Sequence, residues 1–170
     1  MNRRLIIFIA VVIVSLAGWT FLAVQSFLTK QTTKAEIQKA FPADSHPVFM
    51  NADKLTLYSL KPEKQTNSAE SFHDYVVLGK TEIDTLKHQL ELKTAFVAAM
   101  AGANSGGCIN PRHGLRAESK GRTIDLVISF ECQKFMVYSG DQTGEAGINP
   151  ANLEDPFNQI LQNAGVATGK

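Results

Sequence analysis

Hydrophobic residues are arranged in two different ways along the chain. Between Leu5 and Val24 they form a run of 20 residues without a charge, whereas further along they recur with the periods typical of strands and helices. A helix rises about 1.5 Å per residue, so a run of this length covers the roughly 30 Å hydrocarbon core of a bilayer. The pattern therefore predicts a membrane-spanning helix followed by a folded domain.

Basic residues flank this apolar run and set its expected orientation. Arg3 and Arg4 precede it, which favours a cytoplasmic N-terminus, although lysines also follow it closely. A cleavable signal peptide is the alternative, but the apolar core of such peptides is normally only about 7–15 residues long. We expect an uncleaved signal-anchor over residues 1–28. The protein would then be a single-pass inner-membrane protein whose C-terminal domain faces the periplasm or the outside of the cell.

The segment from 29 to 47 differs from both patterns. It reads TKQTTKAEIQKAFPADSHP, is mostly polar and contains two prolines, which is typical of a linker. It predicts a stalk and places the start of the exported domain at Val48, so that the domain spans residues 48–170.

Alternation of apolar and polar residues predicts the strands. It runs over Lys54–Leu60 and over Arg122–Cys132, and β-favouring residues indicate a further strand centred on Tyr75–Leu78. The polar stretch KPEKQTNSAES at 61–71, between the first strand and the one centred on Tyr75–Leu78, is expected to be a loop. The glycine-spaced sequence GDQTGEAG at 140–147 is expected to be another.

Two segments carry helical signals. Asp84–Ala103 has Asp84 as a credible N-cap, and its apolar residues, Leu86 and Leu90 among them, are expected to pack on the sheet. A last helix near the C-terminus would have Asp155 as its N-cap. Together the elements predict an α+β fold, in which the N-terminal transmembrane helix is followed by a small antiparallel sheet with two packed helices.

Charge argues against a nucleic-acid partner. The chain has 17 Lys and Arg residues, and without the two that precede the apolar run 15 remain against 16 acidic residues. A protein that neutralises several phosphates normally presents a basic face. We therefore expect no nucleic-acid partner, and the membrane, reached through the anchor, is the first expected partner.

The chain has two cysteines, Cys108 and Cys132, and in an exported domain such a pair is more often a disulfide than two free thiols. The sequence HGLRA at 113–117 is expected to pair with the strand Arg122–Cys132 as a hairpin. A two-residue turn at Lys120 and Gly121 matches the apolar faces of these two strands but leaves the cysteines one position out of register. A three-residue loop sets them opposite each other but places a basic residue against an apolar one. We expect the first register, with a bend near Pro111 that brings the sulfurs together.

The same segment offers two rival sites. Cys108, His113 and Cys132 could hold a zinc ion with a carboxylate, or Cys108 could be a nucleophile with His113 as its base. The spacing lacks the paired short intervals of structural zinc sites, and the sequence has no serine-hydrolase elbow, Walker motif or dinucleotide fingerprint. We expect no metal and no cofactor. A binding or structural role is favoured, and a metal- or cysteine-dependent enzyme is the alternative.

Cationic side chains crowd the start of the hairpin. Arg112, His113 and Arg116 could bind an anionic ligand or a protein partner. Alternatively, the arginines pair with carboxylates of the same hairpin, and His113 caps a turn. The carboxylates within reach are Glu118, Asp125 and Glu131.

These motifs resemble an uncharacterised family of small exported or membrane-anchored bacterial proteins. The family is typified by C-x-x-PRHG-[IL]-R-A followed by D-L-x-I-x-F-E-C, and the chain reads CINPRHGLRA and DLVISFEC. The resemblance covers about residues 55–166 and includes YSL, VLGKTEI and PFNQILQNAGV. It implies domain boundaries and a focus on the hairpin, but no activity. Many members read C-F-E-C where this chain has Ser129, so a site that needs two cysteines there is not expected.

Overall fold

The computed structural model describes residues 37–42, 44–64, 70–100, 103 and 106–169. The expected anchor and the first part of the expected stalk lie outside these residues. Within the described part, no helix is both long enough and apolar enough to cross a membrane. The fold described below is that of the compact unit spanning Glu36–Lys170.

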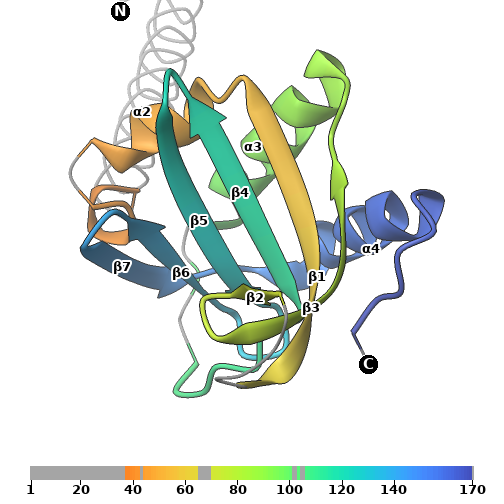
Figure 1. The fold of residues 1–170 in the computed structure, drawn as a ribbon. Helices are drawn as coiled ribbons and strands as arrows, with labels where there is room; N and C mark the ends of the chain where they lie inside the picture. The colour runs from red at the N-terminus through yellow and green to blue at the C-terminus, as the bar shows by residue number, and fades with distance from the viewer. Residues whose placement is uncertain (1–36, 43, 65–69, 101–102, 104–105, 170) are drawn as a thin grey trace, which may run out of the picture. The chain divides into compact units, whose positions relative to one another are not determined.

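A curled antiparallel sheet forms the centre of this unit (Figure 1). Its strands are β1 (Lys54–Lys64), β2 (Ser71–Phe72), β3 (Tyr75–Glu82), β4 (His113–Ser119), β5 (Arg122–Ser129), β6 (Lys134–Ser139) and β7 (Gln142–Gly147). Their order in the sheet is β2-β3-β1-β4-β5-β6-β7. From β4 onward each strand pairs with the next along the chain, whereas β1 lies between β3 and β4. The expected α+β class with an antiparallel sheet is confirmed.

Helices cover one face of the sheet. They are α2 (Ser45–Met50), α3 (Leu86–Met100), the 3-10 turn η1 (Pro150–Asn152) and α4 (Glu154–Asn163). In Figure 1, α3 and α4 lie behind the strands. Their apolar residues share one core with the sheet side chains that face them. The largest buried members of this core include Phe49, Phe96, Phe135, Phe157, Leu55, Leu57, Leu115, Ile124 and Leu126. We call the opposite side of the sheet the outer face.

The helix α3 packs on the sheet with only part of the expected apolar face. Its buried residues are Gln89, Leu92, Lys93, Phe96 and Met100. Leu86 and Leu90, which the apolar pattern assigns to the packed face, are 79% and 62% exposed. Polar side chains take inward positions because they find buried partners: Lys93 Nζ and Gln89 Nε2 donate to main-chain carbonyls at 2.9 and 2.8 Å. For Leu86 and Leu90 the prediction of packing on the sheet is wrong.

Both predicted helix caps are also displaced. At α3, the hydroxyl of Thr85 rather than the carboxylate of Asp84 accepts the main-chain N–H of His88, at 3.3 Å. At α4, Asp155 lies inside the first turn, and no side chain caps the helix. Acidic residues in that first turn still favour the helix, because they interact with the positive end of its dipole.

The core begins ahead of the expected domain boundary at Val48. Residues 37–40 are helical, and Ala40 and Phe41 are buried. The ring of Phe41 packs against that of Phe135 in β6, with 6.3 Å between their centroids. The described end of the expected stalk therefore packs with the folded unit, because it carries apolar side chains that the core can bury.

The sequence 140–147, expected to be a loop, contains the edge strand β7. Gly140 has a φ of 58° and forms a two-residue turn with Asp141, since Ser139 pairs with Gln142 across it. Glycine lets the chain adopt this left-handed angle without a steric penalty. The repeated glycines misled the prediction, because only the first of them lies in the turn.

The β4–β5 hairpin has the expected register. Leu115 pairs with Leu126, so the apolar faces of the two strands match. Lys120 and Gly121 have φ angles of 49° and 77°, which is the pair of left-handed angles that a type I′ turn requires. The two-residue turn is confirmed, and with it the face on which each side chain of the hairpin lies.

Candidate functional site

Cys108 and Cys132 form a disulfide, with their Cα atoms 5.6 Å apart, as predicted. The segment ahead of β4 reaches the end of β5 because Ser129 holds it there. The Ser129 hydroxyl accepts the N–H of Asn110 at 3.1 Å and donates to the Asn110 carbonyl at 3.0 Å. The disulfide cross-links the two ends of the hairpin segment, and in this form neither sulfur is a thiolate that could ligate zinc or attack a substrate.

His113 lies on the helix face, where it is 3% exposed. Its Nε2 lies 3.0 Å from Oδ1 of Asn158 in α4, and its ring packs against the rings of Phe130 and Phe157. Burial lowers the pKa of His113 to about 4 because the charged form loses its hydration. His113 is therefore a neutral ring in the packing between the sheet and α4, and it caps no turn.

Arg112 lies just before β4, where its carbonyl accepts the N–H of Leu60 at 2.9 Å. Its guanidinium is 3.8 Å from the carboxylate of Glu131, and the side-chain amide of Asn110 donates to the same carboxylate. Glu131 is largely exposed, so this pair is a solvated surface contact of little energetic weight.

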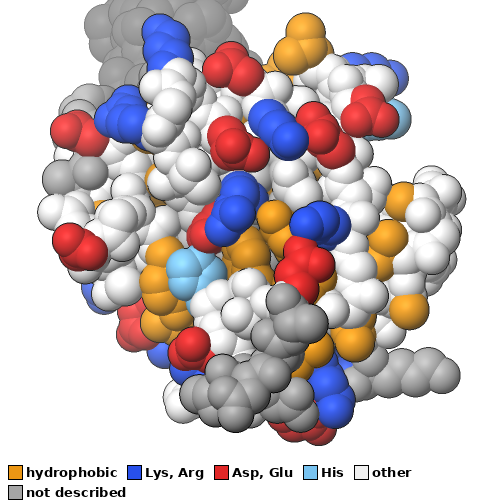
Figure 2. Space-filling model, viewed as in Figure 1, with side chains coloured by type: hydrophobic (Ala, Val, Ile, Leu, Met, Phe, Trp, Pro, Cys, Tyr) orange, Lys and Arg blue, Asp and Glu red, His pale blue; other side chains and the backbone are white. Residues whose placement is uncertain are grey.

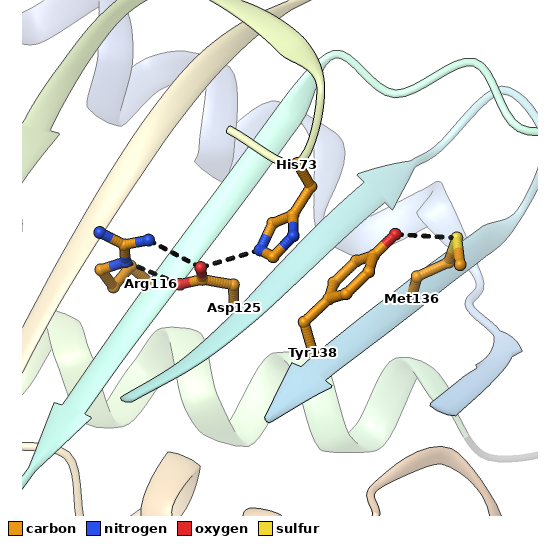
Figure 3. A network of polar contacts seen from close by, with 5 residues as sticks. All are labelled: His73, Arg116, Asp125, Met136 and Tyr138. Atoms are coloured by element: carbon orange, nitrogen blue, oxygen red, sulfur yellow. Dashed lines mark hydrogen bonds and ion pairs between the residues drawn. The ribbon is translucent and has the colours of Figure 1, made fainter. Parts of the chain in front are cut away.

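Arg116 points to the outer face, opposite to His113, because the two residues are an odd number of positions apart in one strand. Its Nε and Nη2 donate to the two carboxylate oxygens of Asp125 in β5, both at 2.7 Å (Figure 3). The Asp125 side chain is 9% exposed, whereas that of Arg116 is 38% exposed. One edge of the guanidinium is thus bound to a buried carboxylate, and the rest of the group reaches solvent.

His73 joins this pair from the turn between β2 and β3. Its Nε2 lies 2.8 Å from Asp125 Oδ2, and its ring stacks on Tyr138 at 3.8 Å between centroids (Figure 3). Burial would raise the pKa of Asp125, but the hydrogen bonds from Arg116 and His73 outweigh burial and hold it below its usual range. We call His73, Arg116 and Asp125 the outer network.

The β2–β3 hairpin folds over the outer face and covers part of it. The ring of Phe72 packs against that of Tyr58 in β1, with 4.5 Å between the ring centroids. Arg116 lies over both rings, 5.5 Å from the centroid of Phe72 and 5.9 Å from that of Tyr58. A glycine is needed beneath the hairpin, because a Cβ on Gly114 would approach the Phe72 ring to 2.7 Å. Figure 2, which views this face, shows basic side chains and a histidine around hydrophobic groups near its centre.

The structure therefore separates the three site residues that the sequence grouped. His113 is buried under α4, Arg112 lies at the end of the sheet, and only Arg116 faces outward from the middle of the strands. The outer network instead combines Arg116 with His73, whose role the sequence did not reveal. The contact between His73 and Asp125 joins positions 52 residues apart in the chain, so no local pattern indicates it.

The arrangement favours recognition over bond-making chemistry. His73 and Asp125 resemble the base-and-orienter pair of some hydrolases, but in the described part of the chain no hydroxyl or thiol is bonded to the ring of His73. Nor do the described residues hold three His, Cys, Asp or Glu side chains in a metal-binding arrangement. Comparison of the chain with protein-family models, curated proteins and solved structures gives no match. The site is therefore interpreted from its geometry.

Proposed function

We propose that the protein is a membrane-anchored binding module whose domain faces the periplasm or the outside of the cell. Residues 1–28 would hold it in the inner membrane, and the outer face of the sheet would recognise a partner. The resemblance to exported bacterial proteins and the 20-residue uncharged run support this location. The disulfide agrees with it, because such bonds persist in oxidising compartments.

The observation that carries the binding role is the fixed guanidinium of Arg116. Two of its nitrogens are committed to Asp125, and its plane is supported by aromatic rings. The third nitrogen, Nη1, has no hydrogen-bond partner among the described residues and points away from Asp125 in Figure 3. A rigid donor edge of this kind loses little conformational entropy on binding, which is how arginine contributes most at recognition surfaces.

The partner group that fits this edge is an anion, such as a carboxylate on a protein. Lys80, on β3 at the other flank of β1, is a second cation near Tyr58, 5.9 Å from the ring centroid. It pairs with Glu70 at 2.6 Å. An incoming carboxylate would compete with Glu70 for Lys80 while it accepts hydrogen bonds from Arg116. Such exchange of ion-pair partners gives specificity more than raw affinity.

Affinity capture with the full-length chain tests this proposal. The chain is cross-linked in its own membranes, and captured proteins are compared between the wild type and Arg116→Lys, which keeps the charge but loses the planar donor edge. Arg122→Lys, at an exposed arginine at the start of β5, is the matched control, because it makes the same substitution and keeps the positive charge at that position. We expect Arg116→Lys to remain folded and to lose a partner that both the wild type and Arg122→Lys retain. Equal capture by all three proteins would contradict the proposal.

The metal- or cysteine-dependent enzyme remains the alternative function. It would require Cys108 and Cys132 to be reduced and His113 to leave its buried contact with Asn158. The contacts described above do not support this alternative.

A further inference from the structure

The first half of α3 is inverted with respect to an ordinary surface helix. Its inward side carries Gln89 and Lys93, whose side chains donate to the carbonyls of Ile83 and Ala52. Its solvent side carries Leu86 and Leu90, which are one turn apart and are the two most exposed large hydrophobic residues of the described chain. A helix of a globular domain normally shows the reverse arrangement. The exposed leucines therefore need a separate explanation.

A hollow of about 660 Å³ lies beside these leucines. It is bounded by the end of α2, the connection from α2 to β1, the first half of α3 and the end of the β4–β5 hairpin. Met50 and Ala52 are among its apolar residues, and Lys120 and Arg122 lie at the end of the hairpin. We call Leu86, Leu90 and the rim of this hollow the apolar edge. It is formed where these four segments meet at one end of the fold.

The charges around the apolar edge are mixed. Lys120 and Arg122 at the rim of the hollow are basic, and Asp53 there is acidic. Lys87 and Glu91 are also paired across one helical turn at 3.8 Å. Net charge therefore neither attracts nor repels strongly, and the exposed leucines decide what can bind here.

The size of the edge limits the choice of occupant. A stable protein interface buries about 1,200–2,000 Å² in total, far more than two leucines and a shallow rim can supply. The same two side chains suffice for a domain that is already tethered to a surface, because the tether removes the translational cost of binding. The favoured occupant is thus one that the chain itself keeps within reach.

The length of chain ahead of the domain supplies such a tether. Twelve residues separate Val24, the end of the uncharged run, from Ile37, the first described residue. Fully extended, they reach no more than about 40 Å, which is comparable with the diameter of a domain of this size. If the run spans the bilayer, the domain cannot leave the neighbourhood of the lipid surface.

We propose that the apolar edge of Leu86 and Leu90 docks on the surface of the bilayer that holds the anchor, with both leucines in the headgroup region. This inference rests on the proposed membrane anchorage. Lys87, Lys120 and Arg122 would meet lipid phosphates, as basic residues do beside an inserted apolar group. The docked domain would present a defined side of its sheet to partners instead of tumbling on its tether.

A tryptophan placed on the edge tests the inference in the full-length chain. Trp19 is the one natural tryptophan and is first replaced by phenylalanine. Leu90→Trp is then reconstituted in vesicles of phosphatidylethanolamine and phosphatidylglycerol at 3:1, with and without lipids brominated near the headgroup. Leu78→Trp, at a 45% exposed position on β3, is the matched control. A third protein combines Leu86→Ser with Leu90→Trp.

We expect brominated lipid to reduce the Leu90→Trp emission at least twofold, to leave Leu78→Trp unchanged, and to act less on the protein with Leu86→Ser. Equal quenching at positions 78 and 90 overturns the docking inference but not the proposed anchorage. The same conclusion follows if position 90 is not quenched while the protein still floats with the vesicles after alkaline treatment. If the emission shifts without quenching, and the shift grows with the protein density in the vesicles, a second copy of the chain covers the edge. That result also overturns the docking inference. A chain that fails to float overturns both this inference and the proposed anchorage.

Discussion

Arg116 and Asp125 face each other across β4 and β5 and share two hydrogen bonds of 2.7 Å. The pair differs from an ordinary solvent-exposed cross-strand ion pair, because Asp125 is nearly buried and also binds His73. The carboxylate thus fixes both the guanidinium and the turn of the β2–β3 hairpin. Asp125 therefore links β4, β5 and the β2–β3 hairpin on the outer face.

A double-mutant cycle measures the strength of this pair. Arg116→Gln and Asp125→Asn should each lower the free energy of unfolding, with a coupling of about 1–3 kcal/mol between them. The exposed edge of Arg116 keeps the value below that of a fully buried pair. Urea denaturation of the four proteins gives the number. The exposed pair Lys61 and Glu63, 2.9 Å apart, is the control and should show no measurable coupling. Equal coupling in the two cycles would contradict the role given to Asp125.

Gly114 should be irreplaceable beneath the β2–β3 hairpin. Gly114→Ala places a methyl group against the ring of Phe72 and should cost about 1–3 kcal/mol, as overpacking usually does. Gly107→Ala is the control, since a Cβ there meets nothing within 4 Å. The unfolding temperatures of both variants, compared with that of the wild type, measure this loss of stability. Adding Phe72→Leu should restore part of the stability lost in Gly114→Ala, and a Gly114→Ala protein as stable as the Gly107→Ala control would refute the contact.

His113 should make the domain less stable in weak acid. Its folded pKa of about 4 lies below the ordinary value of about 6.5, so between these values the unfolded chain binds a proton that the folded chain does not. Stability is therefore complete above about pH 6.5 and falls by about 1.4 kcal/mol per pH unit toward pH 4. Burial lowers the pKa of His46 in the same direction, so the slope must be compared with that of another protein.

His113→Gln provides this comparison, because it keeps His46 and can still donate to Asn158. Chemical denaturation at several pH values between 4.5 and 6.5 should give a shallower slope for His113→Gln than for the wild type. Asp125, whose pKa is held low, loses its contribution only below this range and does not disturb the comparison. Parallel slopes for the two proteins would show that His113 is not buried as described.

Reduction of the disulfide should weaken the fold without abolishing it. The bond joins residues 24 positions apart, and closing a loop of that size contributes about 3 kcal/mol in the chain-entropy model. Urea unfolding with and without a phosphine reductant should show this loss. Cys108→Ser combined with Cys132→Ser should unfold at the same urea concentration as the reduced wild type. A reduced protein as stable as the oxidised one would leave the cross-link without a structural role.

The sequence predicts those features of the fold that depend only on neighbouring residues, such as turns and strand register. The register of the β4–β5 hairpin follows from matching apolar faces and from Lys120-Gly121 as a type I′ turn, and the disulfide follows from that register with a bend. The packed face of α3 could not be predicted in this way. Counting apolar residues favours Leu86 and Leu90, whereas the inward positions of Gln89 and Lys93 depend on carbonyls contributed by other segments.

The candidate site was predicted only in part for a similar reason. Arg116 and its pairing with a hairpin carboxylate are visible in the strand pattern. The odd spacing that sends His113 and Arg116 to opposite faces is visible as well, but it separates residues that look adjacent in the sequence. His73 reaches Asp125 only because the β2–β3 hairpin folds over the outer face, and that closure is a tertiary event without a local sequence signal.

Intact-mass analysis of the full-length chain, extracted from isolated membranes and alkylated without reduction, tests the central claim most directly. If the proposal holds, the chain stays in the membrane fraction after alkaline washing and retains the mass of an uncleaved anchor. It carries no alkyl group, because Cys108 and Cys132 are bonded to each other. Two alkylated cysteines, or a chain found in the soluble fraction, would contradict a membrane-anchored extracytoplasmic binding module.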